Sequence, residues 1–325
     1  MKISVAMCTY NGEKHIKNQI TSILSQSVAV DEIIICDDNS NDNTLSILMQ
    51  FQIENVHKIK IYQNEFNIGS TKNFEKAIEI SSGDYIFLSD QDDIWKVNKV
   101  EKVIQHFTEN PSIEAIFSNA DLINEKNEKI GAITLWDSVF FIEKQLKKPL
   151  DLFCLIKSKR NMVTGATLCI KKEVKNLILP FPNIKKYYHD EWIAIIIASR
   201  NKLNYITEEL ISYRIHSNQQ IGGNTSFHKN TAKKHLRICN YILGNSIPKT
   251  YQDYNQVTKT YYRHYLKYLN VFENTKDNLP VNFKEIAEAN LEFYKKFNIS
   301  LNQKFPILYF LRNGIDKLRG KRQFK

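Results

Sequence analysis

The sequence places three carboxylates within four residues, at Asp90, Asp92 and Asp93. Carboxylates so close together repel one another, and the pattern makes sense mainly if a cation neutralises them. Acidic oxygens suit a hard divalent ion, Mg²⁺ or Mn²⁺, which also holds phosphate oxygens. The cluster therefore predicts a metal site for a phosphate-containing ligand.

Polar residues also follow two other short apolar runs. Residues 3–8 are followed by Thr9-Tyr10-Asn11, and residues 33–36 are followed by Asp37-Asp38-Asn39-Ser40. Asp, Asn and Ser often cap the helix that comes next, and for Asn39 and Ser40 this explanation is as good as a binding role. Capping does not explain three adjacent carboxylates, so the acidic cluster remains the stronger signal.

The elements that would position these residues alternate along the first two thirds of the chain. Short, apolar, β-branched runs predict strands at residues 3–8, 33–36, 59–62, 85–89 and 115–117. Between them, apolar residues recur at helical spacing. Strand then helix, repeated four times, predicts an α/β fold with a parallel sheet flanked by helices. Ligands bind such sheets at the carboxyl ends of the strands, so the three polar segments are expected at one edge.

Charge divides the chain into two parts. Residues 1–220 hold 26 Lys and Arg against 28 Asp and Glu, whereas residues 221–325 hold 19 against 7. We therefore predict a catalytic domain at residues 1–222 and a basic, aromatic-rich helical extension at 223–325. No run approaches the roughly 20 apolar residues that span a bilayer, and the N-terminal run is too short for a signal peptide. These features predict a cytoplasmic protein.

These segments together resemble glycosyltransferase family 2. The resemblance rests on Cys8-Thr9-Tyr10-Asn11-Gly12, Asp37-Asp38-Asn39-Ser40, Asn67-x-Gly69, and Ser82-Gly83-Asp84-Tyr85 leading into Ser89-Asp90-Gln91-Asp92-Asp93. It covers about residues 1–220, with several motifs in the family's order. It implies a GT-A fold, which is Rossmann-like, and an enzyme that inverts the anomeric centre of a nucleotide-activated sugar.

The resemblance also implies where the nucleotide binds. It places the base and ribose against Thr9, Tyr10, Asn11 and Asp38. A carboxylate such as Asp38 can accept a hydrogen bond from the N3–H of uracil or thymine, which favours a pyrimidine nucleotide.

For the acidic cluster, the resemblance implies that Asp90 faces the ribose and that Asp92, assisted by Asp93, holds Mn²⁺ or Mg²⁺ on the diphosphate. The metal would neutralise the leaving nucleoside diphosphate as the sugar bond breaks.

Inversion requires a base that takes the proton of the attacking acceptor hydroxyl. The candidate is Asp190, with Glu191 in reserve, immediately before an apolar helical run at residues 193–198. The resemblance places the catalytic Asp here. The alternative is an ordinary acidic first turn that interacts with the helix dipole.

Arg214 and His216 lie two residues apart near the end of a predicted strand, so both side chains point to the same side. Both can face a diphosphate, and in similar proteins a Tyr-Arg-x-His segment closes over the donor phosphates. The alternatives are a salt bridge for Arg214 and a core or surface histidine.

The motifs Ser-Asp-Gln-Asp-Asp-Ile-Trp, His-Asp-Glu-Trp and Tyr-Arg-x-His look most like the rhamnosyltransferase branch of bacterial family 2 enzymes that build surface polysaccharides such as O-antigen or capsule. This favours a dTDP- or UDP-sugar donor, with dTDP-rhamnose as the leading guess, and a lipid-linked glycan acceptor. Trp95 and Trp136 would either stack on a sugar ring or belong to the core.

Two other classes of function were weighed. A catalytically silent GT-A protein that binds nucleotide sugars or acts as a scaffold would be expected to lack Asp92 or Asp190, and both are present. A nucleic-acid-binding protein is disfavoured, because the basic residues lie outside the predicted site and no nucleic-acid motif is present.

The extension has aromatic residues at helical spacing from Tyr254 to Phe272, which predict a helical subdomain that packs on the catalytic domain. Near its end, basic residues from Arg312 to Lys325 surround apolar ones, as in a helix lying on anionic lipid. We therefore expect peripheral attachment to an anionic membrane surface, at the inner face of the cell membrane.

Overall fold

The computed structural model describes residues 1–137, 139, 143–144, 151–158, 161–185, 187–216, 236–237, 240–241, 246–275 and 279–320. The chain divides into two compact units. The first comprises Met1–Phe140, Asn161–Phe181 and Lys186–Phe227, and the second comprises Phe141–Arg160, Pro182–Lys185 and His228–Lys325. The boundary predicted at Gly222-Gly223 lies outside the described residues and stays a prediction.

The first unit is built on one sheet, with nine strands among the described residues. They are β1 (Ile3–Thr9), β2 (Glu32–Asp37), β3 (Ile59–Gln63), β4 (Tyr85–Ser89), β5 (Ile94–Trp95), β6 (Ala115–Ile123), β7 (Lys129–Thr134), β8 (Cys169–Lys171) and β9 (Leu203–Arg214). Their order is β3-β2-β1-β4-β8-β6-β9-β5, and β7 pairs with β6 off this path.

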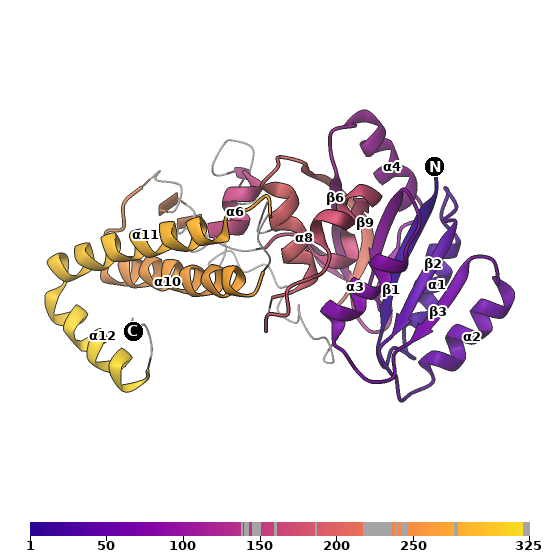
Figure 1. The fold of residues 1–325 in the computed structure, drawn as a ribbon, viewed down its shortest axis with the longest axis horizontal. Coiled ribbons are helices and arrows are strands. Elements are labelled where there is room, and N and C mark those ends of the chain that lie inside the picture. Colours follow the sequence, from indigo (N-terminus) through magenta and orange to yellow (C-terminus); the bar gives the residue numbers. More distant parts are fainter. Residues whose placement is uncertain are drawn as a thin grey trace. The chain divides into compact units, whose positions relative to one another are not determined.

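Helices cover this sheet (Figure 1). They are α1 (Ile16–Leu24), α2 (Thr44–Glu54), α3 (Ser70–Ile80), α4 (Lys99–Glu109), α7 (Lys175–Ile178) and α8 (His189–Ala198), with the short 3₁₀ turns η1 (Gly165–Thr167) and η2 (Lys172–Val174). Every residue of β1 and β2 is buried, as expected for strands covered on both faces.

The predicted alternation is confirmed for the first four strands, because β3, β2, β1 and β4 are mutually parallel. The fifth predicted strand, now β6, does not join β4. The short strand β8 lies between them and is antiparallel to both. The sheet is therefore mixed beyond β4.

A glycine permits the close approach of β4 to β1. Any Cβ at Gly83 would lie 2.5 Å from the Ser4 hydroxyl and 2.6 Å from the Ser4 nitrogen. The Gly83 N–H donates to the Ser4 hydroxyl (2.7 Å), which itself donates to Glu32 (2.6 Å). Three strands are thus joined at their amino ends, opposite the edge where ligands bind.

The second unit is helical. It contains α6 (Leu152–Ser158), α10 (Tyr251–Glu273), α11 (Phe283–Lys304) and α12 (Pro306–Leu318). Figure 1 shows α10 and α11 packed along one another. The predicted aromatic stripe is their interface: Tyr261 stacks on Phe293 and Phe297, with ring centroids 5.1 and 5.7 Å apart. Among the described helices, none combines the length and hydropathy needed to cross a bilayer.

Candidate active site

The carboxyl ends of β1, β2 and β4 form one edge of the sheet, as predicted. Thr9 pairs with Asp37 in the β1–β2 register, and the Thr9 hydroxyl donates to the Asp37 carboxylate (2.8 Å). The Asn11 N–H donates to the Ser40 hydroxyl (2.9 Å). Ser40 therefore supports the loop after β1 instead of capping α2, which begins at Thr44.

Gln91 joins the first loop to the acidic cluster. Its side chain accepts a hydrogen bond from the Tyr10 N–H (2.7 Å) and donates to the Tyr10 carbonyl (2.9 Å). A Cβ at Gly12 would overlap the Gln91 side chain, so the glycine of this motif leaves room for it. The sequence did not indicate this role of Gln91, because a neutral side chain between carboxylates has no evident part in metal binding.

Asp38 is buried and organises the loop before α3. Its carboxylate accepts hydrogen bonds from the Asn64 side chain (2.8 Å) and from the backbone N–H groups of Ile68 (2.8 Å) and Gly69 (2.9 Å). Gly69 has a φ of 84°, which explains the glycine of the Asn67-x-Gly69 motif. A carboxylate has about four acceptor positions, so Asp38 retains capacity for a base N3–H. That contact stays a prediction.

The acidic cluster is fixed by the end of β9. Strands β5 and β9 pair with Ile94 opposite Ser212, which brings Arg214 to the cluster. The Arg214 N–H donates to Asp93 (2.9 Å), and its guanidinium donates to the carbonyls of Asp92 (2.5 Å) and Asn124 (2.6 Å). Arg214 is fully buried and braces the backbone of the cluster. Its contact with a diphosphate stays a prediction.

His216 has a different position. Its Nε2 lies 2.8 Å from a carboxylate oxygen of Asp92, and its ring is 5.6 Å from that of His15. A carboxylate oxygen is a preferred ligand for Mn²⁺, and an imidazole nitrogen is a ligand for other divalent first-row metals. The sequence did not indicate that His15 lies next to His216, because the residues around His15 in the chain match no functional motif.

These residues suit a divalent ion whose coordination shell is completed by substrate. Within the described segments, no three His, Cys, Asp or Glu side chains form a ready metal-binding group. Mg²⁺ and Mn²⁺ sites commonly use one or two protein ligands, with waters and substrate phosphates supplying the rest. Asp93 also has one buried oxygen without a hydrogen-bond partner among these residues. Asp92 and His216 therefore fit as the one or two protein ligands of the predicted ion, with Asp93 behind them.

Burial and mutual repulsion perturb the carboxylates. Burial, with the neighbouring charges of Asp92 and Asp190, raises the pKa of Asp90 to about 7. Burial, Asp92 and Asp90 together raise the pKa of Asp93 well above its usual range. The raised pKa values mean that the ionised carboxylates repel one another, and a bound cation would relieve this repulsion.

Lys99 is a second residue that the sequence did not reveal. It is fully buried at the start of α4, donates to the Ala166 carbonyl (2.9 Å) and lies 3.9 Å above the ring of Trp95. Burial lowers its pKa to about 7, while Asp93 and Asp90 oppose this shift. The helical pattern around Val100 and Val103 gave no indication that an adjacent lysine would be covered.

Asp190 lies in the first turn of α8, where the Glu191 N–H donates to its carboxylate (2.6 Å). Such a cap by itself would lower the pKa of Asp190. Burial outweighs it and raises the pKa to about 7. Asp190 also acts electrostatically on Asp90, so the two lie in the same site. Glu191 is partly buried beside it.

Gly165 and His189 shape the surroundings of Asp190. A Cβ at Gly165 would lie 2.5 Å from Nε2 of His189, whose ring stacks on Phe74 at 4.0 Å. Burial lowers the pKa of His189 to about 3, so the ring is neutral. The Gly165 N–H also helps to stabilise the Asp190 carboxylate.

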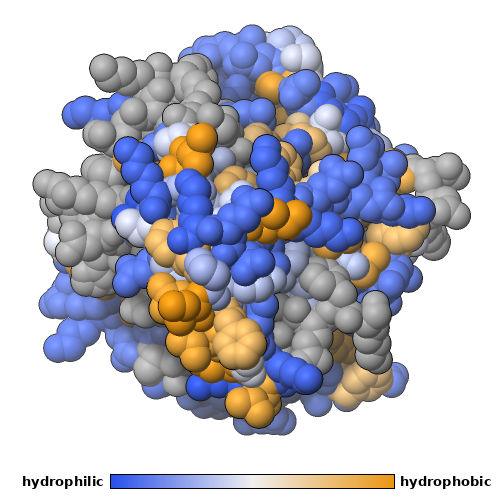
Figure 2. All heavy atoms as spheres, turned by 90° about the vertical axis from the view of Figure 1, so that its left-hand side faces the viewer, coloured by the Kyte–Doolittle hydropathy of each residue, from blue (hydrophilic) through white to orange (hydrophobic). Residues whose placement is uncertain are grey.

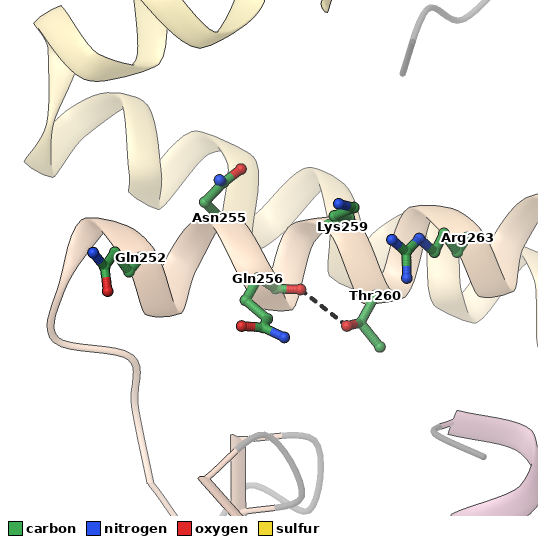
Figure 3. Close-up of a pocket in the computed structure, with 6 residues that line it drawn as sticks. All are labelled: Gln252, Asn255, Gln256, Lys259, Thr260 and Arg263. Carbon is green, nitrogen blue, oxygen red and sulfur yellow. Dashed lines mark hydrogen bonds between the residues drawn. The ribbon is translucent and has the colours of Figure 1, made fainter. Parts of the chain in front are cut away.

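The tryptophans belong to the core. Trp95 and Trp136 are each 3% exposed, so stacking on a sugar is not their role. A hollow of about 470 Å³ lies on α10, lined by Gln252, Asn255, Gln256, Lys259, Thr260 and Arg263 (Figure 3). None of these residues is acidic, and the carboxylates predicted to be catalytic belong to the other unit.

Comparisons with known proteins bear on the family and the fold of this chain. Residues 4–162 match the family model described as glycosyl transferase family 2. The chain is 32% identical over 233 residues to dTDP-rhamnosyl transferase RfbG of Shigella flexneri, covering 68% of this chain and 75% of RfbG. It is 30% identical over 194 residues to UDP-Glc:alpha-D-GlcNAc-diphosphoundecaprenol beta-1,3-glucosyltransferase WfgD of Escherichia coli, covering 60% and 69%.

The fold is shared with TarS residues 1–349 of S. aureus, whose crystal structure is a complex with UDP-GlcNAc. The TM-score is 0.55 at 16% identity, over 100% of this chain and 94% of the other. The predicted GT-A fold, with helices following it, is confirmed.

Proposed function

Because the chain belongs to glycosyltransferase family 2, we propose that it is a metal-dependent, inverting enzyme that moves a sugar from a dTDP- or UDP-activated donor to a glycan hydroxyl. The observation that carries this proposal is the meeting of Asp90, Asp92, His216 and Asp190 at one edge of the sheet. Nucleotide-sugar chemistry needs a site for the diphosphate and a base for the acceptor, and this edge supplies both.

Asp92, with Asp93 behind it, would hold Mn²⁺ or Mg²⁺, and His216 would add a nitrogen ligand in the case of Mn²⁺. When bound, the ion neutralises charge that develops on the leaving diphosphate. Thr9, Tyr10, Asn11 and Asp38 would hold the nucleoside at the ends of β1 and β2. The hydrogen bond from the Tyr10 N–H to the Gln91 side chain connects this subsite to the acidic cluster. Asp90 would orient the ribose.

Asp190 would act as the general base, with Glu191 as its alternative. The acceptor oxygen attacks the anomeric carbon, the bond from that carbon to the diphosphate breaks, and the acceptor proton passes to Asp190. A carboxyl with a pKa of about 7 is well matched to this task near neutral pH. The hydrogen bond from the Glu191 N–H holds the carboxylate in place.

We assign a lipid-linked glycan as the acceptor class and a growing bacterial surface polysaccharide as the product. The name of WfgD specifies a diphosphoundecaprenol-linked acceptor, and that of RfbG a dTDP-rhamnosyl transfer. These names favour dTDP-rhamnose first and a UDP-hexose second. Such an acceptor would keep the enzyme in the cytoplasm, at the anionic inner face of the cell membrane.

The test has two stages. Thermal shift with UDP, dTDP and their sugars, each with Mn²⁺ and with chelator, identifies the donor; a ligand at 100 times its Kd adds about 2.7 kcal/mol. Transfer from that donor to a lipid-linked acceptor is then followed by chromatography. A protein that binds a donor but never transfers its sugar to such acceptors, or to water, would be the catalytically silent GT-A alternative.

A further inference from the structure

Helix α12 packs with its polar side inward. Arg312 and Asp316 are its buried residues, 5% and 6% exposed, and Tyr309 on the same side is partly buried. Positions 309, 312 and 316 follow helical spacing and form one stripe. A helix of a globular protein normally buries its apolar stripe, so α12 is reversed.

The polar stripe is held by specific contacts within the second unit. The Arg312 guanidinium donates to Asn298 of α11 and, at 3.4 Å, to the Thr258 hydroxyl of α10. The Asn298 side chain also donates to the Tyr309 hydroxyl (3.1 Å). The guanidinium of Arg312 lies 5.1 Å from the centre of the Tyr309 ring. Rotating α12 to bury its apolar residues would break these contacts, so the contacts with α10 and α11 hold the helix in this orientation.

The opposite side of the helix is apolar and open. We call it the α12 apolar face, and it consists of Ile307, Leu308, Phe310, Leu311, Ile315 and Leu318, which are between 42% and 88% exposed. Figure 2, which looks at the end of the molecule where Figure 1 draws α12, shows apolar residues gathered in its lower part. An exposed patch of this kind on one helix marks an interaction surface.

We propose that the α12 apolar face inserts into the interfacial region of an anionic lipid bilayer. Charge selects lipid over a second copy of the chain. Residues 221–325 carry 19 Lys and Arg against 7 Asp and Glu, so two such segments repel one another while anionic headgroups attract them. Lys304, Lys317 and Arg319 are exposed at the two ends of the helix.

This corrects one part of the expectation from sequence. Arg312 was counted among the lipid-facing charges, but it is buried against α10 and α11. Insertion of the α12 apolar face therefore provides most of the attachment to the bilayer, and the remaining basic residues assist it. Charge attraction is screened within about 3 Å at 1 M salt, whereas burial of apolar side chains is not screened. Attachment is expected to survive high salt.

The inference rests on the proposed function only in that a lipid-linked acceptor makes a membrane location useful. Its test uses the full chain without substrates, so the two can fail separately. Sedimentation with phosphatidylglycerol-containing vesicles and with phosphatidylcholine vesicles would be measured at about 0.1 M and about 1 M salt. In a separate assay, transfer activity on a detergent-dispersed acceptor should be the same for the wild-type protein and for the variants below.

Three variants separate the contributions. Leu311→Gln with Ile315→Gln alters the α12 apolar face without touching buried groups, and should lower vesicle partitioning at least about tenfold. Lys317→Gln with Arg319→Gln should lower it by up to about 30-fold at low salt and leave it unchanged at high salt. Ile53→Gln with Phe66→Gln is the matched control, since these side chains are 79% and 65% exposed in the first unit. This control variant should partition into vesicles like the wild-type protein.

Three outcomes would overturn the proposal. They are wild-type protein that ignores anionic vesicles, binding that disappears at high salt and responds only to the charge pair, and a dimer in light scattering that the Leu311→Gln, Ile315→Gln variant dissociates. The last result would make the face an interface between two copies.

Discussion

The carboxylate of Asp92 lies 2.8 Å from Nε2 of His216, joining the acidic cluster after β4 to the end of β9, 124 residues later. The pairing of β5 with β9 produces this contact, and the bonds from Arg214 to the cluster maintain it. Asp92 and His216 should therefore behave as one unit in metal binding.

The first prediction tests that unit. Asp92→Asn removes a charged ligand and should abolish metal-dependent donor binding and turnover, whereas His216→Ala should weaken Mn²⁺ affinity about 10–100-fold. Calorimetric titration of UDP or dTDP with and without Mn²⁺ measures both effects. Full activity in excess chelator would refute the assignment.

The second prediction separates chemistry from binding at Asp190. Asp190→Asn keeps the shape of the side chain but cannot accept a proton, so kcat should fall about 10²–10⁴-fold with donor affinity nearly unchanged. Glu191→Gln, one residue along, is the control. If Glu191→Gln shows the large loss and Asp190→Asn does not, the base is Glu191.

The third prediction concerns pH. Burial raises the pKa of Asp190 to about 7, so the base is protonated and inactive below that value. The logarithm of kcat should rise with unit slope as pH increases toward 7 and then level off. The residual activity of Asp190→Asn should lack this limb. A wild-type rate that is flat from pH 5 to pH 8 would contradict the role.

The fourth prediction concerns stability at Gly83. Gly83→Ala forces a Cβ into the Ser4 backbone and should cost about 1–3 kcal/mol or more, because the backbone atoms of Ser4 and Lys2 beside it cannot move away. Gly314→Ala, which meets nothing within 4 Å inside α12, should be neutral or stabilising. Urea denaturation of both variants provides the comparison. If Gly83→Ala were as stable as the wild-type protein, β1 and β4 would have to be able to separate locally.

The fifth prediction concerns Lys99. Lys99→Met removes a buried amine whose pKa of about 7 leaves it only partly charged at pH 7, and it deprives the Ala166 carbonyl of its donor, so it should lower the free energy of unfolding by about 1–3 kcal/mol. Lys102→Met, on the same helix with a side chain 42% exposed, should change it by less than about 0.5 kcal/mol. A small effect at Lys99 would mean that the acidic cluster does not depend on it. Chemical denaturation measures both.

Local pattern was enough to locate the parallel strands β1 to β4, the helices between them and the polar residues at the ends of β1, β2 and β4, but it did not reveal β5, β7 or β8. The reason is that β1, β2 and β4 are covered by helices, so their apolar composition was visible as short runs. The chemistry of the acidic cluster was equally visible, because carboxylates at adjacent positions repel whatever the fold around them.

Contacts between distant segments were decided only by the tertiary structure. The insertion of β8 between β4 and β6, the burial of Lys99 and Arg214, and the meeting of Asp90 with Asp190 depend on strand order and register. The orientation of α12 is the clearest case. Its sequence has both an apolar and a polar stripe, and hydrophobicity alone would bury the first. The contacts of Arg312 with Asn298 and Thr258 bury the second, because those partners lie on other helices of the same unit.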